Sequence, residues 1–311
     1  MNRVLAHTGA TYPILQAPMG WIARSTLASA VSRAGGLGII ETSSGETANC
    51  QREIAIMRET GLPFGVNLPI RFLKDDAMLR FVCESGLRFV TTSAGSPAKF
   101  LAPLQAAGIA VYHAVPTLEA ALKCAEAGVD GLVVEGSEGG GFKNPEEVST
   151  LVLLQAIREK TDLPLIAAGG IVDGRGMAAA FALGAEAIQM GTRFVACAES
   201  PVHPHYKQAI VDAPTTGTYM LNTKSSPCIR ALKAPFTQTL HEAGLMGPDA
   251  FRGIQEVYFG GDMNAAPALA GQSAGLVHAV LTAQQIIDQT VAEFHQISQR
   301  LGQLAQRRSF D

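Results

Sequence analysis

Two kinds of segment alternate along most of the chain. Stretches rich in Ala and Leu with helical spacing, such as "STLASAVSRA" and "TLEAALKCAEA", end at glycine and are followed by short apolar or β-branched runs. Glycine at such a junction is typical of a helix C-terminus. Short runs that are apolar throughout are typical of parallel strands covered on both faces. The pattern therefore predicts repeated βα units around a parallel sheet.

The spacing of these units predicts a barrel. The junction glycines lie at 36, 61, 86, 108 and 128, so one unit occupies 20 to 25 residues. With a first strand in "YPILQAPM", eight strands are predicted, over residues 14–17, 37–40, 64–68, 89–92, 110–114, 131–135, 165–168 and 187–190. Eight strands with seven intervening helices indicate a (β/α)8 TIM barrel, whereas a doubly wound sheet would normally contain fewer strands in one layer.

Two connections are longer than the repeat requires. The unit between strands six and seven has about ten extra residues, in "VVEGSEGGGFKNPEE", and about 120 residues follow strand eight. We expect residues 196–264 to form an insertion in the last βα connection, a lid over the barrel mouth. The barrel itself would comprise residues 1–195 and 265–300, closed by a long C-terminal helix. Loops that leave the carboxyl ends of barrel strands form the active site, so both extensions are expected there.

Composition narrows the class of protein. The chain has 311 residues, 47% of them hydrophobic, and a formal net charge of −3 with only 24 Lys and Arg, which argues against nucleic-acid binding. No apolar run reaches the roughly 18 residues of a spanning helix, and the N-terminus lacks the features of a signal peptide. Five scattered cysteines without a CxxC pair indicate neither disulfides nor a zinc cluster. We expect a cytoplasmic enzyme with a small-molecule substrate and no metal; a homo-oligomer is compatible with the sequence.

Glycine-bearing turns follow the last two predicted strands. Gly169 and Gly170 come after strand seven, and Gly191 and Thr192 come after strand eight. Backbone N–H groups in such turns bind phosphate, and the Thr hydroxyl adds a donor. One Gly pair alone would more often be a simple turn. Two pairs at the strand ends where barrels commonly hold phosphate favour a phosphate site.

The motifs "QAPMGWIARSTLASAVSRAGGLGII", "PFGVNL", "EGSEGGG", "AAGGIVDGRGMAAAFALGAEAIQMGTRF" and "GQSAGLV" together resemble the nitronate monooxygenase (2-nitropropane dioxygenase) family. That family includes related flavin-dependent quinone and enoyl-[acyl carrier protein] reductases. The resemblance implies a TIM barrel that binds FMN noncovalently, with its phosphate on the two glycine turns. It places Ala17, Pro18, Met19, Asn67 and Gln189 near the flavin ring or ribityl chain, and Ser273 and Gly275 near the phosphate side.

The sequence departs from the family at a position that carries chemistry. Many members have His at the end of the glycine loop, beside flavin and substrate, where this chain has Phe142. Phenylalanine cannot take a proton, so the catalytic residue is unknown and the position suits an apolar pocket wall. Ala114 stands where some quinone reductases carry Lys. Gly139, Gly140 and Gly141 would let the loop pass close to the cofactor or substrate.

For the other candidate residues, a functional interpretation is weighed against a structural one. Glu138 either faces the substrate or stabilises its loop, and Trp21 either covers the flavin or packs in the core. His113 is expected to point behind the barrel wall as a structural residue. Lys224 and Arg230 either bind an anionic substrate group, such as a CoA phosphate, or, as we favour, lie on a solvated face. For His203 and His205 a lid loop is favoured over a metal site.

These observations predict an FMN-dependent oxidoreductase that oxidises alkyl nitronates with O2 through reduced flavin. The alternative is an NAD(P)H-dependent reductase of an enoyl thioester or quinone, with NADH or NADPH as a second cofactor. A barrel that binds flavin or a phosphosugar without redox turnover is the third possibility.

Overall fold

Eight parallel strands form a closed barrel in the computed structural model, which describes residues 1–73 and 75–306. The strands are β1 (Ile14–Gln16), β2 (Gly38–Ile40), β3 (Phe64–Pro69), β4 (Phe89–Ser93), β5 (Ala110–Val115), β6 (Gly131–Glu135), β8 (Leu165–Ala168) and β9 (Ala187–Met190). Their order is β1-β9-β8-β6-β5-β4-β3-β2, and a parallel bridge between Leu15 and Leu37 joins the two ends. The predicted (β/α)8 barrel is confirmed, and each strand was placed within one or two residues.

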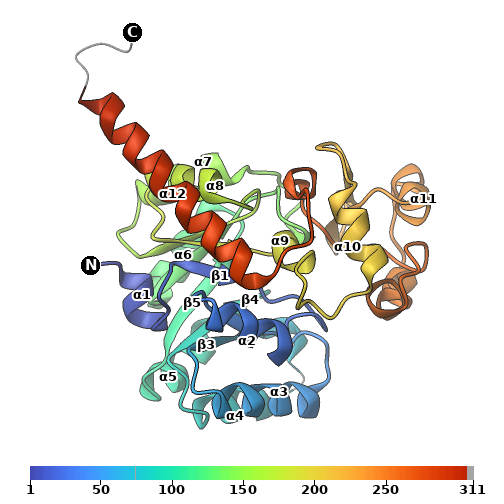
Figure 1. Cartoon of the computed structure of the whole chain (residues 1–311). Coiled ribbons are helices and arrows are strands. Elements are labelled where there is room, and N and C mark those ends of the chain that lie inside the picture. Colours follow the sequence, from blue (N-terminus) through green and yellow to red (C-terminus); the bar gives the residue numbers. More distant parts are fainter. Residues whose placement is uncertain (74, 307–311) are drawn as a thin grey trace.

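A helix follows each of the first seven barrel strands and covers the outside of the wall (Figure 1). These are α2 (Ser25–Arg33), α3 (Thr47–Glu59), α4 (Ala77–Cys83), α5 (Ala98–Ala106), α6 (Leu118–Ala127), α7 (Thr150–Arg158) and α8 (Gly174–Ala182). The long helix α12 (Ala283–Ala305) packs between α8 and α2 and closes the ring, as expected. Gly174 permits this packing, because a Cβ there would lie 2.4 Å from the Phe294 amide nitrogen. Among the described residues, no helix combines the length and apolar character needed to cross a bilayer.

Alternate strand residues fill the barrel interior. Leu15, Phe89, Tyr112, Val133 and Ile166 belong to one buried cluster, whereas their strand neighbours pack outward against the helices. The amino-terminal end of the barrel is covered by α1 (Arg3–Thr8), whose Val4 joins the same cluster. This helix was not predicted from the sequence. By the same alternation, Asn67, Ala114, Glu135, Ala168 and Gln189 face the interior near the carboxyl ends of their strands.

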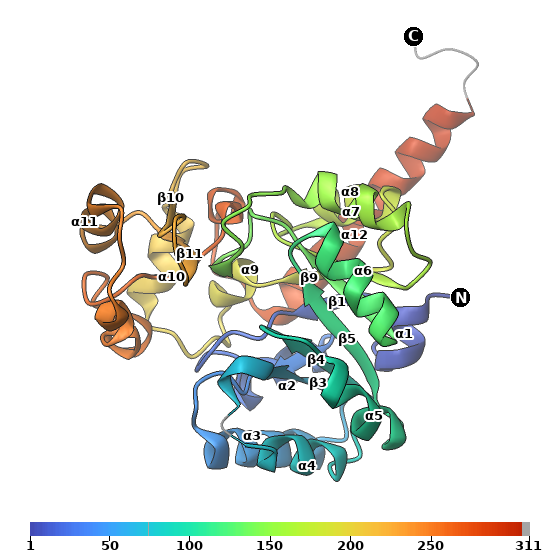
Figure 2. The ribbon, with the colours of Figure 1, turned by 180° about the vertical axis from the view of Figure 1, so that it is seen from behind.

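The connection after β9 forms a separate layer beside the barrel (Figure 2). It contains α9 (Thr192–Val195), α10 (Pro204–Val211), β10 (Thr218–Leu221), β11 (Cys228–Leu232) and α11 (Pro235–Ala243). Single turns follow at Pro248–Phe251, Glu256–Gly260 and Gln272–Leu276, and another follows β3 at Ile70–Phe72. Strand β11 pairs with β10 and also with β7 (Gly141–Lys143), which belongs to the extended loop after β6. The insertion is therefore hydrogen-bonded to a barrel loop, through a small sheet that was not predicted.

Candidate functional site

Polar side chains from separate strands converge at the barrel mouth. Asn67 is buried, and its Oδ1 accepts a hydrogen bond from Thr91 Oγ1 at 2.9 Å. Gln189 is 9% exposed, and its Oε1 is buried with no hydrogen-bond partner among the described residues. A buried amide oxygen without a partner is costly, so this atom suits a ligand that donates to it.

Of the two turns predicted to bind phosphate, the one after β9 lies next to the first strand. Gly169 and Gly170 adopt positive φ angles of 94° and 73°. The Ala17 amide donates to Met190 O at 2.9 Å, and a Cβ on Gly191 would meet only Ala17 Cβ, at 3.6 Å. Gly191 therefore borders free space. The structure thus brings the turn after β9 together with the predicted flavin-contact segment that begins at Ala17.

Thr192 connects this turn to the segment before α12. Its Oγ1 accepts from the Gly271 amide at 2.9 Å, which leaves the hydroxyl hydrogen to donate elsewhere. Ser273 is buried in the turn that follows. Gly275 has a packing explanation, since a Cβ there would lie 2.5 Å from Thr215 Cα in the insertion.

Other parts of the same chain lie close to the three glycines after β6. A Cβ on Gly139 would lie 2.7 Å from Glu135 Oε1 and 2.8 Å from Lys143 Nζ. A Cβ on Gly140 would lie 2.6 Å from the carbonyl carbon of Ala270, and Gly141 has a φ of 76°. The close approach anticipated from the sequence is present. At the first two glycines, however, an ion pair and a neighbouring backbone occupy the space expected for cofactor or substrate.

Glu138 stabilises its loop. Its Oε2 accepts hydrogen bonds from the Thr150 amide at 2.9 Å and from Thr150 Oγ1 at 3.0 Å. Thr150 is the first residue of α7, where unpaired N–H groups favour a carboxylate. These contacts match the structural interpretation of Glu138.

Phe142 lies in an aromatic cluster at the mouth. Its ring centroid lies 5.8 Å from that of Phe72 and 5.8 Å from that of Phe251, and its side chain is 52% exposed. The three rings come from the turn after β3, from β7 and from the insertion, and we call them the aromatic trio. The ring adds apolar surface at the mouth, and its role as the wall of a substrate pocket stays a prediction.

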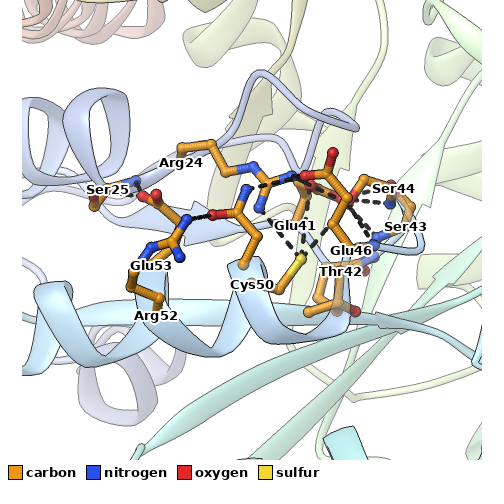
Figure 3. A network of polar contacts seen from close by, with 12 residues as sticks. Arg24, Ser25, Glu41, Thr42, Ser43, Ser44, Glu46, Cys50, Arg52 and Glu53 are labelled. Atoms are coloured by element: carbon orange, nitrogen blue, oxygen red, sulfur yellow. Dashed lines mark hydrogen bonds and ion pairs between the residues drawn. The ribbon is translucent and has the colours of Figure 1, made fainter.

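A buried ion-pair network supports the loop that carries Ala17 to Trp21 (Figure 3). Arg24 Nη2 lies 2.7 Å from Glu41 Oε1, and the Glu41 side chain is fully buried at the end of β2. Glu41 Oε2 also accepts from the Ser43 and Ser44 amides at 2.6 and 2.9 Å. Sequence reasoning missed this network, although a Glu directly after the apolar "GLGII" was an available signal.

Trp21 lies in the same loop with a left-handed φ of 60°. It lines a groove of about 300 Å³ together with Arg24 and with Gln255 and Phe259 of the insertion. Its indole Nε1 is buried without a partner among the described residues. The structure thus places Trp21 between the barrel and the insertion.

The remaining candidates separate clearly. His113 points to the outer face with Thr92 Oγ1 at 2.7 Å from its Nδ1, and burial lowers its pKa to about 4, so the structural interpretation holds. His203 Nδ1 accepts a hydrogen bond from the His205 amide and caps α10.

The two cations of the insertion differ in exposure. Lys224 is exposed, in agreement with the favoured solvated face. Arg230 is not on a solvated face: it is 4% exposed, donates to Ser137 O at 2.8 Å and lies 3.2 Å from the Glu147 carboxylate.

The cysteines are free thiols with raised pKa values. Burial is the main cause in each case, and it raises the pKa to about 11 at Cys124 and about 12 at Cys197. The pKa values of Cys50, Cys83 and Cys228 are also raised. A thiolate nucleophile at neutral pH is therefore not favoured at these positions.

A closed barrel with glycine turns and polar side chains gathered at the carboxyl ends of its strands defines an enzyme of the TIM-barrel class. The profile of the nitronate monooxygenase family matches residues 2–80 and 71–293, and the chain belongs to that family. It is an oxidoreductase, as its relatives are named nitronate monooxygenases and dehydrogenases.

Three relatives illustrate the range of the family. A nitronate monooxygenase of Pseudomonas aeruginosa is 35% identical over 274 residues, covering 72% of this chain and 77% of its own. A Rhodococcus jostii (3aS,4S,5R,7aS)-5-hydroxy-7a-methyl-1-oxo-octahydro-1H-indene-4-carboxyl-CoA dehydrogenase is 33% identical over 241 residues, covering 76% and 67%. The structure of FabK from Thermotoga maritima superposes with a TM-score of 0.92 at 38% identity, covering 97% and 98% of the two chains.

Proposed function

We propose that this protein is an FMN-dependent oxidoreductase that oxidises alkyl nitronates with O2. FMN would supply the redox chemistry by taking an electron pair from the nitronate and passing it to oxygen. Three features of the described residues fit the cofactor: the Gln189 oxygen without a partner among them, the free space beside Gly191 and the available hydroxyl hydrogen of Thr192. The turns after β8 and β9 would hold the phosphate, and Asn67 and Gln189 would contact the ring or ribityl chain.

The side chain at position 142 is the observation that favours a nitronate over a neutral nitroalkane as the substrate. Phe142 lies in the loop that the family uses for His, and its ring packs against those of Phe72 and Phe251. A neutral nitroalkane must lose a proton before it reduces the flavin, whereas a nitronate is already an anion. An apolar ring at this place is compatible with the preformed anion and leaves the neutral substrate without a base there.

A reductase of an enoyl thioester or quinone, driven by NADH or NADPH, is the second candidate. The observation in its favour is the aromatic trio, which presents two substantially exposed rings, Phe72 and Phe142, at the mouth. Such a surface suits a larger apolar substrate. The name of the Rhodococcus relative, a carboxyl-CoA dehydrogenase, supports a thioester in this branch of the family.

Anaerobic mixing separates the two candidates. The purified protein is first tested for bound flavin by its visible spectrum, and the flavin is identified after release. Ethylnitronate or propionate 3-nitronate is then mixed with the enzyme in an anaerobic stopped-flow instrument, and NADH and NADPH are mixed in parallel. Bleaching by the nitronate, with reoxidation by O2, supports the proposal. Bleaching by the nicotinamides alone supports the reductase, and a flavin that neither reagent bleaches contradicts both.

A further inference from the structure

A partly buried ion pair lies inside the loop that follows β6. Lys143 Nζ contacts Glu135 Oε1, and a Cβ at residue 139 would lie within 2.8 Å of both atoms. The Lys143 side chain is 4% exposed and the Glu135 side chain 33%. Glu135 is the last residue of β6, and Lys143 reaches it from β7.

The pair faces the mouth of the barrel. Glu135 is in register with Ala168 of β8, and Ala168 is in register with Gln189 of β9. All three follow interior-facing residues two positions earlier on their strands, so their side chains point to the same space. Glu135 therefore shares this space with the Gln189 oxygen, which has no partner within residues 1–73 and 75–306.

Such a pair is an expensive way to stabilise a loop. The Lys143 ammonium is almost wholly removed from water and the Glu135 carboxylate partly so, and this desolvation commonly offsets the attraction between them, so the pair is weak evidence for stability. Glycine at 139 leaves room for both groups, since a Cβ there would lie 2.7 Å from Glu135 Oε1 and 2.8 Å from Lys143 Nζ. The position of the pair suggests that its charge is used.

We propose that Lys143, positioned by Glu135, stabilises the negative charge that a flavin ring gains on reduction; this inference rests on the proposed flavin site. A fixed cation beside the ring favours the reduced state and so raises the reduction potential. Ala114, the interior-facing residue of the adjacent strand β5, offers no charge at the mouth. Lys143 provides one from a different segment of the chain.

Loss of Lys143 and loss of Glu135 are expected to shift the flavin reduction potential in opposite directions. Loss of the ammonium leaves the Glu135 carboxylate beside the site, which disfavours added negative charge. Loss of the carboxylate leaves the ammonium without its counter-charge, which favours it. A structural role alone would make both substitutions destabilising, with no reason for opposite redox effects.

The test measures the flavin midpoint potential by spectroelectrochemical titration of the holoprotein. Lys143→Met is expected to lower the ratio of reduced to oxidised flavin at a fixed potential by at least tenfold, about 30 mV for a two-electron couple. Glu135→Gln is expected to raise that ratio, and Lys143→Arg should stay within about threefold of the wild type because it keeps the charge. By linkage, Lys143→Met should weaken the binding of reduced FMN tenfold more than that of oxidised FMN.

Lys123→Met is the matched control, because Lys123 forms an exposed ion pair with Glu119 on α6. Equal potentials in the Lys143→Met and Lys123→Met proteins would overturn the inference while leaving the flavin site intact. If Lys143→Met does not fold, the sign of the Glu135→Gln shift decides: a lowered or unchanged potential refutes the role of the pair. A wild-type protein that binds no flavin contradicts the proposed function itself, and the inference with it.

Discussion

Gly140→Ala tests whether the extended loop and the segment before α12 must pass each other without side chains. The new Cβ would lie 2.6 Å from Ala270 C, 2.7 Å from Gly271 N and 2.8 Å from Ala270 Cα. All three atoms are backbone, so no side-chain rotation relieves the contact. On the other side, a Cβ on Gly271 would lie 2.5 Å from Glu138 O. The two backbones must therefore separate.

The cost of this separation follows from the distances. Carbon contacts are favourable at about 3.5–4.0 Å, so the segments must move apart by roughly 1 Å. Overpacking of this kind costs about 1–3 kcal/mol. The movement also stretches the Gln272 N to Glu138 O bond of 2.9 Å and the Gly271 N to Thr192 Oγ1 bond of 2.9 Å, each worth about 1 kcal/mol. With the smaller unfolded-state entropy of alanine subtracted, the expected loss is about 2–4.5 kcal/mol.

Urea denaturation of Gly140→Ala and Gly302→Ala measures this difference. Gly302 lies exposed in α12, where a Cβ would meet no described residue within 4 Å, so alanine there should stabilise by about 0.5–1 kcal/mol. Gly140→Ala should lower the midpoint and weaken FMN binding roughly tenfold, because Thr192 shifts with Gly271. A Gly140→Ala protein with unchanged midpoint and unchanged flavin affinity would show that this contact relaxes at no cost.

Three further substitutions test other parts of the site. Phe142→His should let a neutral nitroalkane bleach the flavin anaerobically, at a rate that rises with pH through about 6.5; no gain would mean that a missing base is not what limits this substrate. Arg230→Met should destabilise by about 2 kcal/mol and expose the insertion to proteolysis, because it leaves Ser137 O unpaired, while Lys224→Met should do neither. Burial lowers the His113 pKa to about 4, below its unfolded value near 6.5, so the unfolded chain takes up the proton first as the pH falls. Stability should therefore decline by about 3 kcal/mol between pH 6.5 and 4, and urea titrations of His113→Gln should lack that slope.

The barrel was predictable because its signals are local. Each strand is a short apolar run, and glycines at 61, 86, 108 and 128 take positive φ angles just after their helices. The helix α1 was not predicted because six residues are too few to show a helical period. Strands β7 and β11 were not predicted for another reason. They pair Phe142 with Ile229, and a pairing between residues so distant in sequence produces no local sequence pattern.

The same distinction applies to the candidate site. The glycine turns after β8 and β9 were identified from adjacent residues, and the structure places the second turn beside Ala17. Arg230 was assigned to a solvated face because "NTKSSPCIRALK" reads as polar, whereas its partners Ser137 and Glu147 come from the loop after β6. The burial of Lys143 was not predicted, because a lysine in a polar loop is normally exposed. Its burial depends on Glu135, eight residues earlier, and on glycine at 139.

The loop after β6 presents different chemistry on the two faces of β7. Consecutive strand residues point to opposite sides, and here the Phe142 ring is half exposed in the aromatic trio while the Lys143 side chain is buried against Glu135. One face would then contact the substrate and the other would set the charge near the flavin. Because Phe142 and Lys143 also pair with Ile229 and Cys228 of β11, the insertion holds both side chains in register. A change in β11 that shifts this register by one residue would exchange the two faces, so substrate choice and redox potential should change together.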